Sequence, residues 1–135
     1  IYGYLRALPP EKMQDYLNKN PSYVFFKPVE GAAETFLGLP PVDGRTFAAD
    51  QRFFPKGALA FVVSTKPKWS APDQYVTTEY EPFSRFLLDQ DIGGAITGGG
   101  HIDLFWGEGD DARRNAGVMK QTGRLYYLAP KAKAP

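Results

Sequence analysis

Short β-branched and aromatic runs, each bounded by proline or glycine, most constrain what this chain can fold into. Runs of this composition between turn residues are typical of strands. Strands are predicted at residues 22–29, 45–50, 58–63, 83–96, 101–107 and 125–129. Helices are predicted at residues 9–21 and 110–124. Because strands and helices do not alternate, the pattern favours a mainly β fold, a small β-barrel with helical appendages, over a doubly wound sheet.

Composition narrows the class of protein further. The 135 residues are 43% hydrophobic and 15% aromatic, enough to fill one core. A net charge of +1 argues against a nucleic-acid partner. The absence of cysteine and a single histidine argue against a zinc–thiolate or His-based metal centre, and no cofactor is expected. No signal peptide or membrane span is visible, and a chain that begins at Ile1 is expected to be a mature or excised piece.

Two aspartates stand among apolar and glycine residues in the segment QDIGGAITGGGHIDLFWG, residues 90–107. A carboxyl group in apolar surroundings resists ionisation, so Asp103 could act as a protonated general acid. Strand alternation places His101 and Asp103 on one face and the apolar residues between them on the other, and one face must be core. The alternatives are structural: Asp103 could cap a sheet end, Asp91 could bond its own turn, and His101 could be a core or rim residue.

The glycines of this segment are open to two interpretations. Gly98, Gly99 and Gly100 could form a flexible hairpin tip, or they could let a bulky ligand approach the backbone. They match no phosphate-binding loop, because no Lys-Ser/Thr pair follows them.

Several ordered motifs resemble one known family. They are AADQRFFPKG (48–57), DQDIGGAITG (89–98), HIDLFWGEG (101–109), AGVMKQTGRLYYLAPK (116–131) and NPSYVFF (20–26). Together they resemble the C-terminal part of the membrane-bound lytic murein transglycosylase A family, which carries a three-aspartate domain. The resemblance implies a double-psi β-barrel, of which this chain would hold only the C-terminal half. Residues 1–30 would be a helical lead-in and strand from the end of the inserted-domain region, and residues 31–135 the three-aspartate barrel portion.

The resemblance also implies the site and the reaction. Asp103 would be the catalytic acid and base, supported by Asp91 and Asp50. The substrate-binding residues would be His101, Gly93, Gly94, Gly98 and Trp106. The implied reaction cleaves the β-1,4 bond between N-acetylmuramic acid and N-acetylglucosamine in peptidoglycan and leaves a 1,6-anhydromuramic acid end. The tethered 6-hydroxyl would be the nucleophile, so that one carboxyl group would suffice.

Two other functions are alternatives to this one. The first is a non-catalytic, expansin-like module that binds polysaccharide, and the second is a murein hydrolase with Asp103 as acid and Asp91 as base. The expected partners are peptidoglycan glycan strands and an N-terminal segment or second chain that completes the barrel. The expected location is the periplasm, with attachment to the outer membrane through a part of the protein outside this chain.

Overall fold

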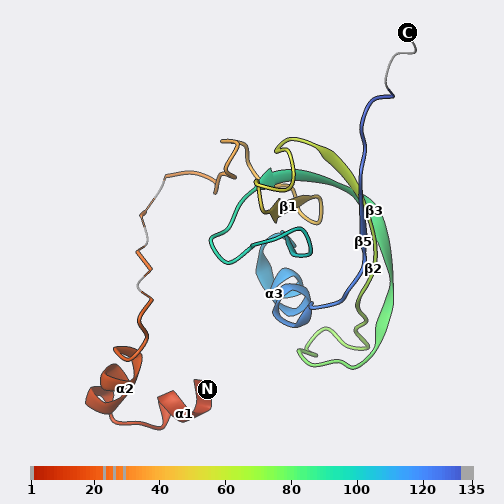
Figure 1. The fold of residues 1–135 in the computed structure, drawn as a ribbon. Coiled ribbons are helices and arrows are strands. Elements are labelled where there is room, and N and C mark those ends of the chain that lie inside the picture. The colour runs from red at the N-terminus through yellow and green to blue at the C-terminus, as the bar shows by residue number, and fades with distance from the viewer. Residues whose placement is uncertain (1, 23, 26, 29, 132–135) are drawn as a thin grey trace. The chain divides into compact units, whose positions relative to one another are not determined.

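The chain divides into two compact units between Glu30 and Gly31, and each is described separately. The computed structural model describes residues 2–131 except 23, 26 and 29. The first unit contains the helices α1 (Tyr2–Arg6) and α2 (Pro10–Leu17), and α1 was not predicted. The second unit contains a five-stranded sheet and one helix (Figure 1). Among the described residues, no helix is long and apolar enough to cross a bilayer.

Helix α2 confirms the helix predicted at residues 9–21, although it is shorter. Pro10 occupies its first turn, where a missing N–H costs nothing, and the helix ends at Leu17 with Asn18 as C-cap. The strand predicted at 22–29 is not seen: residues 22, 24, 25, 27 and 28 are not in a strand. Residues 23, 26 and 29 lie outside the described residues.

The sheet has the strand order β4-β1-β3-β2-β5. Its strands are β1 (Thr46–Ala49), β2 (Leu59–Pro67), β3 (Tyr80–Asp91), β4 (Ile102–Leu104) and β5 (Arg124–Tyr127). Strands β1 and β3 pair in parallel, and the other pairs are antiparallel. The prediction of a mainly β fold with short helices is confirmed, but β4 and β5 are free edges, so the described strands form an open sheet and not a closed barrel.

The longest pairing joins β2 to β3, from Leu59 opposite Leu88 to Pro67 opposite Tyr80. The two strands curve together, and helix α3 (Gly109–Val118) lies on their concave side (Figure 1). The strands predicted at 45–50 and 58–63 are confirmed as β1 and β2. They are consecutive strands, but β3 lies between them in the sheet, so the connection is not a hairpin.

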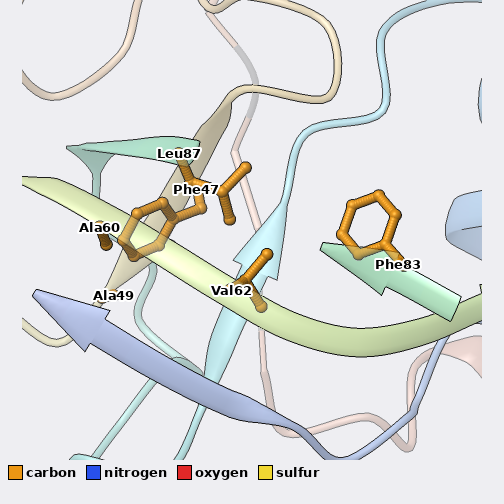
Figure 2. Close-up of a cluster of buried hydrophobic side chains, with 6 residues drawn as sticks. All are labelled: Phe47, Ala49, Ala60, Val62, Phe83 and Leu87. Atoms are coloured by element: carbon orange, nitrogen blue, oxygen red, sulfur yellow. The ribbon is translucent and has the colours of Figure 1, made fainter. Parts of the chain in front are cut away.

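The core lies on one face of this sheet. It contains alternate residues of β1, β2 and β3, namely Phe47, Ala49, Ala60, Val62, Phe83 and Leu87 (Figure 2). Ile102, Leu104 and Trp106 pack against it. The predicted alternation of β4 is therefore correct, and its apolar side is the core side.

Helix α3 begins where it was predicted, with Asp110 and Asp111 favourable in the first turn, but it ends at Val118. Gly123, which lies inside the predicted helical segment, instead directly precedes β5 and lies against β2. A Cβ at Gly123 would lie 2.6 Å from the Val63 carbonyl oxygen and 2.8 Å from Ser64 Cβ. Only glycine allows this close approach of two backbones.

Replacing Gly123 with alanine is therefore expected to destabilise the protein by about 1–3 kcal/mol, the usual cost of overpacking. The matched control is Gly117→Ala, because Gly117 is a helical glycine whose added Cβ meets nothing within 4 Å. This control should be neutral or stabilising by up to about 1 kcal/mol. Urea unfolding of both variants measures the difference, and equal stabilities would contradict the close-approach argument.

Candidate functional site

The topology gathers the three predicted aspartates around one small residue, Ala48, on β1. Ala48 is in register with Asp91 on the β3 side and with Asp103 on the β4 side. Residues in register across a sheet project from the same face. Asp50 follows two residues after Ala48, just beyond the end of β1. Strand spacing places the Cα atoms of Asp91 and Asp103 about 10 Å apart.

A β-bulge produces this arrangement. Phe47 pairs with Asp89, but the next residue, Ala48, pairs with Asp91, so Gln90 is extra in β3. Neighbours in β1 point to opposite faces, and the bulge therefore sends Asp89 to the core face and Asp91 to the other. Without it, residues 89 and 91 would share one face.

Asp50 is buried, at 6% exposure, and every contact it makes favours its charged form. Arg52 donates through Nε and Nη2, the latter at 2.6 Å, and the Gly98 and Arg52 backbone N–H groups donate at 2.8 and 3.0 Å. The Arg52 guanidinium and then these N–H groups hold the pKa of Asp50 well below its usual range. Asp50 is thus a fixed anion that ties the end of β1 to the glycine loop.

Asp91 is half-buried, and its Oδ1 accepts a 2.9 Å hydrogen bond from the backbone N–H of Phe36. The carbonyl of the neighbouring residue, Gln90, accepts from the Leu37 N–H at 3.3 Å. These bonds fasten the loop before β1 to the end of β3, so Asp91 has a structural contact as well as its place beside Ala48.

Asp103 is paired with His101, whose Nε2 lies 3.1 Å from Asp103 Oδ1. The Asp103 side chain is 64% exposed. The expectation that its apolar neighbours keep it dry is wrong within the described residues. The reason is alternation: Ile102 and Leu104 point into the core and leave the carboxyl group on the opposite face.

The predicted glycines differ in what surrounds them. Gly98 has φ +83°, a conformation that favours glycine, and its N–H binds Asp50. A Cβ at Gly93 would meet Ile96 Cδ1 at 2.8 Å, whereas one at Gly94 would meet nothing within 4 Å. Gly94 and Gly98 are therefore the predicted binding glycines with open space beside them, and Gly94 has no positive φ angle.

Trp106 follows two residues after the end of β4 and lies on the core side of the sheet. Its ring lies 5.6 Å from that of Phe83 and packs on the core. Its role as a substrate contact stays a prediction.

A cavity of about 910 Å³ opens on the core face of the second unit. Core residues such as Val62, Phe83 and Leu87 line it, together with the edge strand from Gly100 to Leu104 and the segment from Met119 to Leu125. Asp103 and His101 belong to its wall, but most of the wall that the sheet supplies is apolar.

The sequence analysis missed a buried polar cluster next to the site. Asp89 is fully buried and accepts hydrogen bonds from Lys56 Nζ at 2.5 Å and from Tyr127 Oη at 2.6 Å. Asp89 sits in the apolar run FLLDQD, and a carboxylate there needs a cationic partner. The sequence therefore indicates that Asp89 has a cationic partner, but it does not indicate which residue that partner is.

Comparison with known proteins gives consistent matches. The family profile of the 3D domain matches residues 45–129. Membrane-bound lytic murein transglycosylase A from Vibrio cholerae is 34% identical over 133 residues, 95% of this chain and 33% of the relative. The Escherichia coli K12 protein of that name is 31% identical over 118 residues, 87% of this chain and 31% of the relative. The chain thus spans about a third of the length of these relatives.

Solved structures agree with this. MltA from Neisseria gonorrhoeae has a TM-score of 0.75 at 32% identity, covering 98% of this chain and 32% of that one. Escherichia coli MltA with bound chitohexaose has a TM-score of 0.71 at 26% identity, covering 95% and 37%. The lytic transglycosylase LtgG of Burkholderia pseudomallei has a TM-score of 0.61 at 36% identity, covering 89% and 35%.

The contacts of Asp50 predict an acid-dependent stability. Its folded pKa lies below the unfolded value of about 3.9, so its contribution is fully present above that pH and is lost as the pH falls. The Asp50→Asn variant should lose less stability than the parent between neutral pH and pH 3. Chemical unfolding at a series of pH values tests this, and parallel pH curves for the two proteins would contradict it.

Proposed function

This chain belongs to the 3D domain family and matches the C-terminal part of membrane-bound lytic murein transglycosylase A, and we propose on that basis that it carries the catalytic residues of a peptidoglycan lytic transglycosylase. The observation that carries the proposal is the convergence of three aspartates around Ala48, two of them in register with it.

In the proposed mechanism Asp103 is the single acid and base. As an acid it protonates the glycosidic oxygen between N-acetylmuramic acid and N-acetylglucosamine, and that bond breaks. The resulting carboxylate then accepts the proton of the muramic 6-hydroxyl, whose oxygen bonds to the anomeric carbon and closes the 1,6-anhydro ring. The nucleophile is already tethered to the substrate, so no water is consumed.

The surroundings of Asp103 support this role. The carboxyl group is accessible, which a residue that touches a glycan strand requires, and His101 fixes its orientation through a 3.1 Å contact. Asp91 projects from the same face on the far side of Ala48, where it can hydrogen-bond substrate or Asp103. Asp50 anchors Gly98 and thereby the loop that leads to His101.

The open sheet supports a further part of the proposal, that the complete protein has a double-psi β-barrel. Strands β4 and β5 have unpaired edges within the described residues, and partly buried apolar residues such as Leu104, Trp106 and Leu125 line the cavity on the core face. We propose that an N-terminal segment or a second chain adds the missing strands. An inserted domain facing β4 would also exclude water from Asp103 when glycan binds.

The proposed substrate and location follow from the relatives. One related structure holds chitohexaose, and the curated relatives are named as membrane-bound murein enzymes. We propose that glycan strands of peptidoglycan bind across Asp91, Gly94 and Asp103, and that the protein acts in the periplasm. Outer-membrane attachment would come from a part of the protein outside this chain.

A murein hydrolase is the second candidate. The Cα atoms of Asp91 and Asp103 lie about 10 Å apart by strand spacing, a separation from which the two side chains can reach the carboxyl spacing of inverting glycosidases, about 6.5–9.5 Å. In that reaction Asp91 would activate water, and the product would have a reducing end.

Digestion of purified sacculi by the full-length protein, followed by mass spectrometry of the muropeptides, tests the proposal. Anhydro-terminated products are expected. The Asp103→Asn variant should lose about 10²–10⁴-fold in turnover, the usual contribution of a general acid, with little change in glycan binding.

The matched control is Asp73→Asn, an exposed aspartate in the loop between β2 and β3, which should keep full activity. Reducing ends would favour the hydrolase, and glycan that is bound but intact would favour an expansin-like module. Full activity of Asp103→Asn would refute the assignment of the acid.

A further inference from the structure

The ammonium group of Lys56 is buried and has three acceptors. The side chain is 9% exposed, and Nζ donates to Asp89 Oδ1 at 2.5 Å, to the Ala49 carbonyl at 2.7 Å and to the Asp91 carbonyl at 2.8 Å. An ammonium has three donors, so every one of them is used.

The two carbonyls are the last ones of neighbouring parallel strands. Ala49 ends β1 and directly precedes Asp50, and Asp91 ends β3. Lys56 therefore cross-links the strand ends from which two of the three site aspartates project. The link extends further, because Asp50 holds the Gly98 N–H at 2.8 Å.

Asp89 anchors Lys56 from the core side. Its second oxygen accepts from Tyr127 Oη, and burial together with this carboxylate raises the pKa of Tyr127, so the phenol stays a donor. The Tyr127 ring is stacked on Phe54 at 4.7 Å. Backbone bonds from Gly57 N–H to the Asp89 carbonyl and from Asp89 N–H to the Ala58 carbonyl fix the loop that carries Lys56.

Stability alone does not explain such a pair. The desolvation of two buried charges offsets much of their attraction, and well-packed apolar residues of similar volume are often as stable. What apolar residues cannot do is donate to the two strand-end carbonyls. The specific effect of the ammonium is therefore on the geometry of those ends.

We propose that Lys56, held by Asp89, is a positioning residue that sets the separation of Asp50 and Asp91 for the reaction at Asp103. The inference depends on the proposed function. Lys56 lies beneath the site and acts through the backbone.

The experiment compares two paired substitutions in the full-length protein. Lys56→Met with Asp89→Leu replaces the buried pair by apolar residues of similar size. Lys66→Met with Glu81→Leu is the matched control, because this 2.6 Å ion pair joins β2 to β3 but is partly exposed and lies near the opposite end of the β2–β3 pairing from Asp89. Thermal unfolding, kcat, KM and hydrogen exchange of the Gly98 amide are measured for each.

The expected result for the buried pair is a folded protein with KM within about twofold, and kcat lower by about 10- to 100-fold, the cost of a displacement near 1 Å. The Gly98 amide should exchange faster than in the parent. The control pair should change neither kcat nor Gly98 exchange. The proposal would be overturned if the folded Lys56→Met, Asp89→Leu protein kept the parental kcat and the parental Gly98 exchange rate. It would also be overturned if this protein lost thermal stability but kept the parental activity per folded molecule.

A second variant covers failure to fold. Lys56→Gln with Asp89→Asn keeps the shape, but an amide has two donors for three acceptors, so kcat should still fall. An unchanged kcat in this folded variant would also overturn the proposal. If the parent protein itself releases no cleaved glycan, the proposed function fails, and Gly98 exchange then decides the positioning role without reference to activity.

Discussion

One extra residue in the pairing of β1 with β3 decides on which face of the sheet the neighbouring aspartates lie. Gln90 is bulged out of register, and its Oε1 accepts a 2.6 Å hydrogen bond from Thr46 Oγ1, so the irregularity is held in place by a buried contact. The bulge separates two aspartates that would otherwise share a face. Asp89 joins the core face beside Lys56, and Asp91 joins the face of Asp103.

The acidic residues accordingly fall into two environments. Asp50 and Asp89 are buried, and cations together with N–H or O–H donors satisfy their carboxyl oxygens. Asp103 is exposed, with a histidine as its near partner. A residue that must exchange a proton with substrate requires access, and residues that hold a backbone in place require burial. Under the proposed function, the exposed Asp103 would take part in the chemistry, whereas the buried Asp50 and Asp89 are in supporting positions.

Much of the strand pattern was predictable from the sequence. Apolar and β-branched runs located all five strands of the sheet, and alternation along β4 separated Ile102 from Asp103 correctly. The roles of Asp50, Asp91 and Asp103 came from a family resemblance and stay proposals. Strand order was not predictable, because β1 pairs with β3 across more than thirty residues and nothing local encodes that choice. The dry environment expected around Asp103 was wrong for a local reason, because alternation in β4 turns Ile102 and Leu104 to the core and leaves Asp103 on the opposite face.

The amino-acid sequence alone determines which segments are strands and which side of β4 is apolar. It also indicates that a carboxylate at position 89, inside an apolar run, needs a cation. Only the tertiary structure decides that the cation is Lys56, that Gln90 is bulged, and that Ala48 lies between Asp91 and Asp103. The physical reason is the distance along the chain over which each kind of interaction acts. Side-chain periodicity acts over two to four residues, whereas these contacts join residues 33 to 55 positions apart through strand pairing and burial.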